Sequence, residues 1–111
     1  MATPIYIFDR SENLRLVIEP KNHTELTKED TERPLFYSFG QFIEELNGQE
    51  TLEFHVPYTD KDVDVELIEG DGRAVIRHPT EGYFVEFVIR TPTDINGHNG
   101  IVKEVFCEEL S

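Results

Sequence analysis

The sequence predicts a mainly β protein, folded as a small antiparallel β-barrel or sandwich. Apolar residues alternate with other residues over several short segments, as they do in half-buried strands. β-Branched and aromatic residues, among them eight Phe and four Tyr, are frequent in these segments and favour strands. Turn-forming residues separate the segments. Together these observations predict about seven short strands, joined mostly as hairpins, with at most one or two short helices.

The first two strands are predicted near the N-terminus. Ile5–Phe8 is a short apolar run, and the polar residues directly after it favour a turn. Leu14, Leu16 and Ile18 then occupy alternate positions, as expected for a second strand. The two segments therefore predict a hairpin.

The next two segments differ in how clearly they indicate structure. Residues 21–34 are mostly polar and end in a proline, which is typical of a solvated loop. Residues 35–46 fit either a helix or a strand, since four of their apolar residues have helical spacing, whereas Gly40 weakens a helix. The Asn47-Gly48 pair favours the strand, because a two-residue turn there requires a strand on each side.

Asn47-Gly48 predicts the central hairpin of the fold. Both residues tolerate the positive φ of a type I′ turn. In the register that this turn sets, Ile43 faces Leu52, which is favourable, and two glutamates face each other, which is unfavourable by about a few tenths of a kcal/mol. We expect the structural hairpin to be built on Leu46, Asn47, Gly48, Leu52 and Phe54.

The second half of the chain predicts one ambiguous segment and three clear strands. Asp60 is the expected N-cap of a short helical turn that carries Val63, Leu67 and Ile68 inward, although the alternation there fits a strand almost as well. The predicted strands are 72–78, 83–91 and 101–107, with a turn at 79–82 and a loop at 92–100.

The aromatic strand at 83–91 is predicted as a core or interface strand. Its alternation places Tyr83, Val85 and Phe87 on one face, and Phe84 with its alternate neighbours on the other. We expect one face to pack in the core, and the other could contact another subunit. The residues of interest are Tyr83, Phe84 and Phe87.

Length and charge limit the function classes. The 111 residues suffice for one core, so we predict a single β-rich domain over residues 1–111. With 23 acidic and 10 basic side chains the formal net charge is −13, and repulsion from phosphates disfavours direct nucleic-acid binding. Such a surface suits solubility, imitation of DNA toward a basic partner, or the lining of a conduit through which DNA slides.

The residue types that most often carry chemistry predict no site. Cys107 is the one cysteine, which excludes an internal disulfide, and we expect it to be a small buried thiol. We predict no catalytic, cofactor-binding or metal-binding residue. No cationic leader or run of about 20 apolar residues is present, so we expect synthesis in the cytoplasm and no membrane segment. The histidines lack paired metal-ligand spacing and are expected at the surface: His23, His55, His78 and His98.

Four motifs in this order resemble a known family. They are "PIYIFDRSENLRLVI", "ELNGQETLEFHVP", "GYFVEFVIRT" and "VKEVFCEELS", and together they extend from Ile5 to Leu110. The order resembles the N-terminal region of phage minor structural proteins, the tail-associated lysin or prophage tail endopeptidase family. The most specific part of the resemblance is Leu46, Asn47, Gly48, Leu52 and Phe54.

The resemblance implies a structural role in a phage virion. It implies a tail-tube-like β-barrel that serves as the N-terminal hub domain at the tail tip or baseplate. Copies of the domain would form a trimer below the distal tail protein ring and carry a downstream lysin or fibre region. Any peptidase or muramidase activity would lie in segments beyond Ser111, so the resemblance transfers no catalytic residue and implies no cofactor.

An acidic protein that imitates DNA is the alternative from another class. Such a decoy or immunity protein would block a basic DNA-binding enzyme and bind it with strong salt dependence. A hub domain instead docks through strand edges and apolar patches, with weaker salt dependence. In an extended strand, alternate acidic residues lie about 6.5–7 Å apart, close to the phosphate spacing along DNA. The residues in question are Asp60, Asp62, Asp64 and Glu66.

Overall fold

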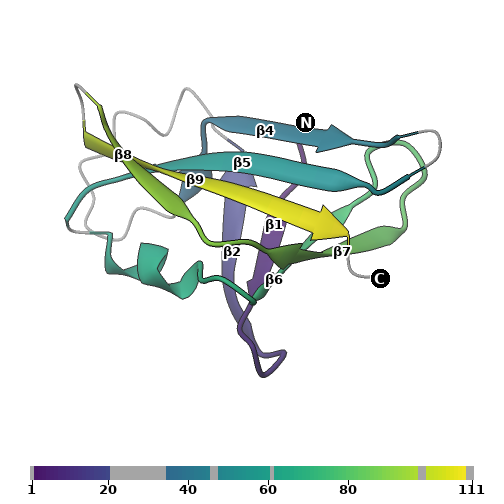
Figure 1. The fold of residues 1–111 in the computed structure, drawn as a ribbon, viewed down its shortest axis with the longest axis horizontal. Helices are drawn as coiled ribbons and strands as arrows, with labels where there is room; N and C mark the ends of the chain where they lie inside the picture. Colours follow the sequence, from purple (N-terminus) through teal and green to yellow (C-terminus); the bar gives the residue numbers. More distant parts are fainter. Residues whose placement is uncertain (1, 21–34, 46–47, 61, 98–99, 110–111) are drawn as a thin grey trace.

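The computed structural model describes residues 2–20, 35–45, 48–60, 62–97 and 100–109, and its strands form one sheet that curls into a nearly closed barrel (Figure 1). The mainly β fold class is confirmed, with nine described strands in place of about seven, a single described 3₁₀ helix, and no α-helix in the described ranges. The elements are β1 (Ile5–Phe8), β2 (Leu14–Pro20), β3 (Phe36–Tyr37), β4 (Phe39–Ile43), β5 (Thr51–Tyr58), η2 (Val63–Leu67), β6 (Arg73–Arg77), β7 (Phe84–Ile89), β8 (Thr93–Gly97) and β9 (Gly100–Glu109).

A one-residue bend brings the two ends of the sheet together. The strand order is β3-β2-β1-β6-β7-β9-β5-β4, so β3 and β4 stand at the two ends of the sheet. Because only Ser38 separates them in sequence, they bring these ends together, and the Ser38 N–H donates to the carbonyl oxygen of His55 at 2.9 Å. In Figure 1, β1 and β2 cross behind β4, β5 and β9. The described strand pairs are antiparallel except β2 with β3.

Alternate side chains of the strands fill the barrel interior. In β5 every second residue from Leu52 to Val56 is buried, and in β7 the same holds from Val85 to Ile89. Burial of each large apolar side chain contributes about 1.5–3 kcal/mol relative to exposure. The largest fully buried side chains are Phe54, Phe87, Ile5, Ile7, Ile18, Leu52, Ile76, Ile89, Val56, Val105 and Cys107.

The connection of the central hairpin is longer than predicted. Leu46 and Asn47 lie outside the described residues. Residues 44–50 separate β4 from β5, where a two-residue turn was expected. Within this connection the Gly48 N–H donates to the carbonyl oxygen of Glu45 at 3.2 Å. The strand interpretation of the segment before the turn is nevertheless confirmed by β4.

The register of this hairpin differs by one residue from the predicted one. Ile43 faces Thr51, and Phe42 faces Leu52, so the predicted pairing of Ile43 with Leu52 is wrong. A shift of one residue exchanges the two faces of a strand. It places Phe42 on the core side, where its ring lies edge-on to Phe87 with 6.0 Å between centroids, and leaves Ile43 41% exposed. The aromatic ring thereby takes the inward position.

The helical turn after β5 begins later than predicted. Asp62, rather than Asp60, occupies the N-cap position of η2, and its side chain makes no capping hydrogen bond. The 3₁₀ geometry places Val65, two positions after Val63, in the core. Of the residues expected inward, Ile68 is buried, Leu67 is half-buried and Val63 is exposed.

The predicted loop at 92–100 contains a strand. Thr93–Gly97 forms β8, which pairs antiparallel with the first half of β9. β7 pairs only with the last three residues of β9, from Cys107 to Glu109. The rest of this edge of β9 is therefore available to pair with β8. This pairing stabilises residues 93–97 as a strand, although their polar composition alone does not indicate one.

Candidate functional site

One outer face of the barrel combines apolar side chains with arginines. It is formed by β2, β1, β6 and β7, where Tyr6 lies between Val17 and Val75 across the ladder. Arg77 lies opposite Phe84. We call this surface the arginine face, and it consists of Tyr6, Phe8, Leu14, Val17, Arg73, Val75, Arg77, Phe84, Glu86 and Val88.

A second outer face combines apolar side chains with carboxylates. It lies on β4, β5, β9 and β8, on the other side of the barrel from the arginine face. His55 Nε2 lies 2.7 Å from Oε2 of Glu53 and 4.0 Å from Oε2 of Glu104. The Phe39 ring packs on the imidazole with 4.6 Å between centroids. We call this surface the acidic face, and it consists of Phe39, Ile43, Glu53, His55, Ile95, Val102, Glu104, Phe106 and Glu108.

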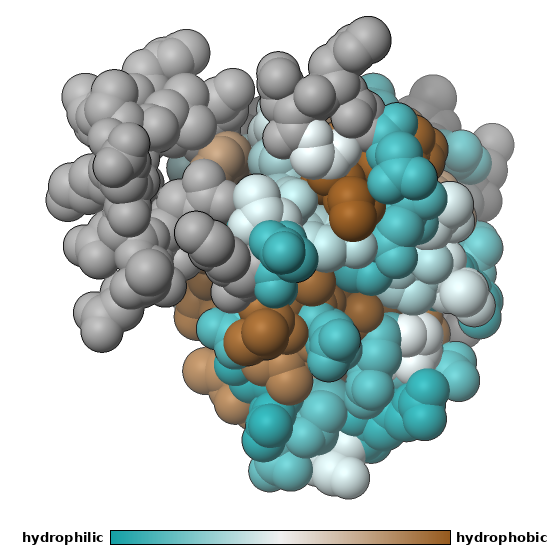
Figure 2. All heavy atoms as spheres, turned by 90° about the vertical axis from the view of Figure 1, so that its left-hand side faces the viewer, coloured by the Kyte–Doolittle hydropathy of each residue, from teal (hydrophilic) through white to brown (hydrophobic). Residues whose placement is uncertain are grey.

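Seven of the nine large apolar side chains exposed in the described residues lie on these two faces, and the other two, Val63 and Tyr83, lie outside them. On the arginine face Phe84 is 65% exposed and Leu14 is 54% exposed. On the acidic face Phe106 is 42% exposed and Phe39 is 40% exposed. Figure 2 views the end of the barrel that carries η2 and the β8–β9 hairpin, and it shows further hydrophobic side chains among hydrophilic ones. Grouped exposed apolar residues are typical of protein contact surfaces.

The structure separates the aromatic residues singled out in the sequence. Leu52, Phe54 and Phe87 are fully buried. Phe84 is on the arginine face, and Tyr83 lies just before β7, half-exposed against the His78 ring. Phe84 and Tyr83 are thus the members of the predicted set that a partner can contact, and a role in an interface stays a prediction.

His78 is buried, contrary to the expected surface position. It is 5% exposed, and its Nδ1 accepts hydrogen bonds from the N–H groups of Thr80 at 3.1 Å and Glu81 at 2.9 Å. Because Nδ1 accepts, the ring proton is on Nε2, which donates to Oε1 of Glu44 at 2.9 Å. The side chain therefore holds the β6–β7 turn and connects it to the end of β4.

Two aromatic rings enclose the His78 imidazole. Phe42 meets it edge-on with 5.3 Å between centroids, and Tyr83 packs on it at 4.9 Å. Sequence reasoning missed this cluster because its members come from two distant segments. The one local signal is a side-chain acceptor directly before a Pro-Thr-Glu-Gly turn, a position where Asn or Asp is usual.

Glu50 lies near this cluster in an unfavourable electrostatic environment. Desolvation by burial, followed by the charges of Glu109 and Glu44, raises its pKa above the ordinary value of 4.5. The backbone N–H of Glu50 donates to Oε2 of Glu109 at 3.2 Å, which holds the Glu109 carboxylate beside residue 50. The folded state therefore binds the Glu50 proton more tightly than the unfolded state does. The stability that this tighter binding contributes is fully present below pH 4.5 and is lost as pH rises through the folded pKa.

Replacement of Glu50 by glutamine is therefore expected to raise the melting temperature at pH 7. The gain should diminish as pH falls and disappear below about pH 4, where the wild-type carboxyl is protonated in both states. Thermal unfolding followed by circular dichroism between pH 3 and pH 8 measures the effect. Glu45→Gln, at an exposed neighbouring position, is the control and should change the melting temperature less. A lower melting temperature of Glu50→Gln at pH 7 would contradict the repulsion described here.

The remaining candidate residues do not assemble a reactive centre in the described part of the chain. Cys107 is fully buried, and burial raises the pKa of its thiol, which disfavours the thiolate. Among the described residues no three His, Cys, Asp or Glu side chains are placed to hold a metal ion, and no helix is long and apolar enough to cross a membrane. The prediction of no catalytic residue stays a prediction.

The acidic row proposed for DNA imitation does not lie along a strand. Asp64 and Glu66 are in η2, and Asp62 directly precedes it. A 3₁₀ helix turns every three residues, so alternate side chains do not line one face. The expected spacing of about 6.5–7 Å along an extended strand is therefore wrong for this segment.

Comparisons with protein-family models, with curated proteins and with solved structures found no match. Both faces expose apolar side chains; the arginine face holds Arg73 and Arg77 with one carboxylate, Glu86, which lies 3.8 Å from Arg73, and the acidic face holds Glu53, Glu104 and Glu108.

Proposed function

We propose that the chain is a structural domain of a phage tail tip, a baseplate-hub component that docks to the distal tail ring and carries a downstream lysin or fibre region. The observation that carries this proposal is that the arginine face and the acidic face lie on opposite sides of one barrel. Each of them exposes apolar side chains, one beside arginines and the other beside carboxylates. A subunit inside an assembly needs contacts on more than one side, and a barrel with two such faces meets that need.

Charge complementarity supports a head-to-tail arrangement of copies. Arg73 and Arg77 of one copy would meet the carboxylates of the next copy's acidic face, among them Glu53 and Glu104. Contacts between two different faces are heterologous, and they form a closed ring when the rotation between copies allows it. The trimer implied by the family resemblance is the ring that we propose, with the virion tail tip as its location.

The net charge fits a position beside the DNA path. A chain of formal charge −13 repels phosphates, so a lumen lined by it would not retain DNA during ejection. The domain would then let DNA pass without binding it. Its direct partners are tail proteins.

Paired charge reversal tests this proposal. Variant one carries Arg73→Glu and Arg77→Glu, and variant two carries Glu53→Lys and Glu104→Lys. In the presence of a distal tail ring protein, each variant alone should associate about tenfold more weakly than wild type, because like charges meet across the interface. An equal mixture of the two variants should recover assembly, since each interface in it again pairs opposite charges. Analytical ultracentrifugation measures the association.

Two outcomes would overturn the proposal. One is assembly of each single variant at wild-type strength, which would remove the complementary faces from the interface. The other is absence of ring binding together with tight, steeply salt-dependent binding to a basic DNA-binding enzyme, which would identify the DNA-imitating class.

A further inference from the structure

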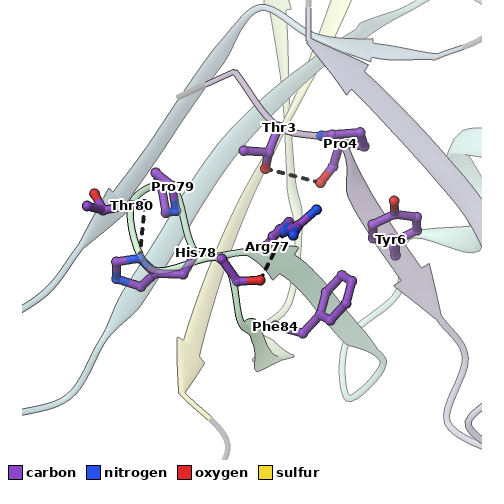
Figure 3. A pocket seen from close by; sticks show the side chains of 9 residues that line it. Thr3, Pro4, Tyr6, Arg77, His78, Pro79, Thr80 and Phe84 are labelled. Atoms are coloured by element: carbon purple, nitrogen blue, oxygen red, sulfur yellow. Dashed lines mark hydrogen bonds between the residues drawn. The ribbon is translucent and has the colours of Figure 1, made fainter.

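A concave pocket opens at the edge of the arginine face (Figure 3). Its volume is about 440 Å³, within the range of small-molecule sites. Pro4 and Tyr6 line one side and Phe84 another, and the Arg77 guanidinium lies between them. The rings of Tyr6 and Phe84 are edge-to-face with 6.3 Å between centroids. Thr3, His78 and Thr80 also line the pocket, so apolar and polar walls surround the one arginine in it.

Hydrogen bonding positions the guanidinium and leaves its far end free. Nε of Arg77 donates to the carbonyl oxygen of Gly82 at 2.9 Å, which holds the side chain across the β6–β7 turn. No other described residue accepts a hydrogen bond from Arg77, and no described carboxylate lies within 4.0 Å of it. Its two Nη groups therefore present parallel donors to the pocket.

Among the other described cations, Arg73, Arg90 and Lys103 each lie within 4.0 Å of a carboxylate, whereas Arg10, like Arg77, donates Nε to a backbone carbonyl. Lys103 bonds Asp94 at 3.0 Å, and Arg90 bonds Glu108. On the same strand and face as Arg77, Arg73 donates to the carbonyl oxygen of Asp71 at 2.8 Å. Arg77 is the cation among these that also lines a pocket with two aromatic rings, Tyr6 and Phe84.

We propose that this pocket binds a carboxylate attached to an apolar or ring-shaped body. The carboxylate would accept two parallel hydrogen bonds from Nη1 and Nη2 of Arg77, the bidentate geometry that a guanidinium favours. The body of the ligand would pack on the Tyr6 and Phe84 rings, which offer both edges and faces. This binding activity goes beyond the structural role proposed above and does not depend on it.

The chemistry favours a carboxylate over a free inorganic anion. The formal charge of −13 repels small anions at a distance, so a charge contact with one exposed arginine is weak by itself. A ligand that also buries apolar surface gains about 25 cal/mol per Å² from the aromatic walls. The same chemistry is present in a free aromatic or sugar acid and in a peptide that presents a carboxylate beside an aromatic side chain.

Amide NMR titration of the full chain at about 0.15 M ionic strength tests the site with defined probes. Phenylacetate, glucuronate and an Asp-Phe dipeptide represent the possible sources, and inorganic phosphate and glucose are the comparison ligands. We expect at least one carboxylate probe to give saturable shifts confined to Arg77 Nε–H and to the amides of Tyr6, Gly82 and Phe84. The strongest of the three probes identifies the source.

Substitutions make the assignment specific to Arg77. Arg77→Gln should weaken carboxylate binding about tenfold or more, and Arg77→Lys should recover only part of it, because an ammonium lacks the two parallel donors. Arg73→Gln is the matched control, since this arginine already bonds backbone carbonyls, and it should leave the affinity unchanged. The amide spectrum of each variant confirms that it is folded.

Three results would overturn this inference. The first is the absence of saturable shifts with every carboxylate probe up to about 50 mM, well above the roughly millimolar dissociation constant of a weak specific site. The second is unchanged binding in folded Arg77→Gln. The third is phosphate binding as tightly as the carboxylates, which would reduce the pocket to a general anion contact.

Discussion

Replacement of Phe87 by alanine is expected to lower the free energy of unfolding by about 3–5 kcal/mol. The Phe87 side chain is fully buried, and its residue pairs with Ala74 in β6 and with Glu109 in β9. Its ring also meets Phe42 of β4 edge-on, so it joins both halves of the barrel. Truncation removes the buried surface and leaves a cavity between these strands. Urea unfolding followed by circular dichroism measures the loss.

Phe84→Ala is the matched control, with the same substitution three positions earlier on the same strand. Phe84 is 65% exposed on the arginine face, and its one described ring contact is the edge-to-face pair with Tyr6. We expect a loss of about 0.5–1.5 kcal/mol, clearly smaller than for Phe87. Equal losses in the two variants would contradict the assignment of one ring to the core and the other to the outer surface.

Replacement of His78 by alanine is expected to lower the free energy of unfolding by about 2–3 kcal/mol. The change removes the acceptor for the N–H groups of Thr80 and Glu81 and the donor to Glu44. His78→Asn should retain part of the stability, because an amide oxygen near the position of Nδ1 can accept from the same turn. Urea unfolding of the three proteins gives the comparison.

The His78 tautomer gives an independent measurement. A long-range ¹H–¹⁵N spectrum should show the proton on Nε2, as the two bonds to Nδ1 require. His55→Ala is the control, since this histidine lies on the acidic face outside the core and should change stability by less than about 1 kcal/mol. A proton on Nδ1, or an equal effect of the two histidine substitutions, would contradict the role of His78 in holding the turn.

Local sequence patterns were sufficient to predict strands in segments where burial alternates along the chain. The alternation along 51–56 and 83–91 predicts two opposite faces in each strand, because a strand must place successive side chains on opposite faces, and the structure shows that Phe54 and Phe87 are on the inward ones. The register of β4 against β5 could not be predicted in this way. It depends on the length of the 44–50 connection and on the packing of the Phe42 ring, neither of which is encoded in the turn residues alone.

Other features depend on contacts between distant parts of the chain. β8 forms because β9 extends beyond the end of β7, and that extension is visible only once the sheet is assembled. The burial of His78 depends on Glu44, which lies 34 residues earlier. The arginine face likewise exists because β1 lies between β2 and β6 and so joins side chains from separate hairpins. The candidate surfaces therefore required the strand order, which one sequence does not specify.

Immunogold electron microscopy of phage particles from the source strain, with antibodies raised against residues 1–111, tests the proposed function most directly. The hub proposal predicts gold label at the tail tip, at the end furthest from the head, on intact particles. Label absent from particles, with the protein recovered only from the cell extract, would contradict a role in the virion.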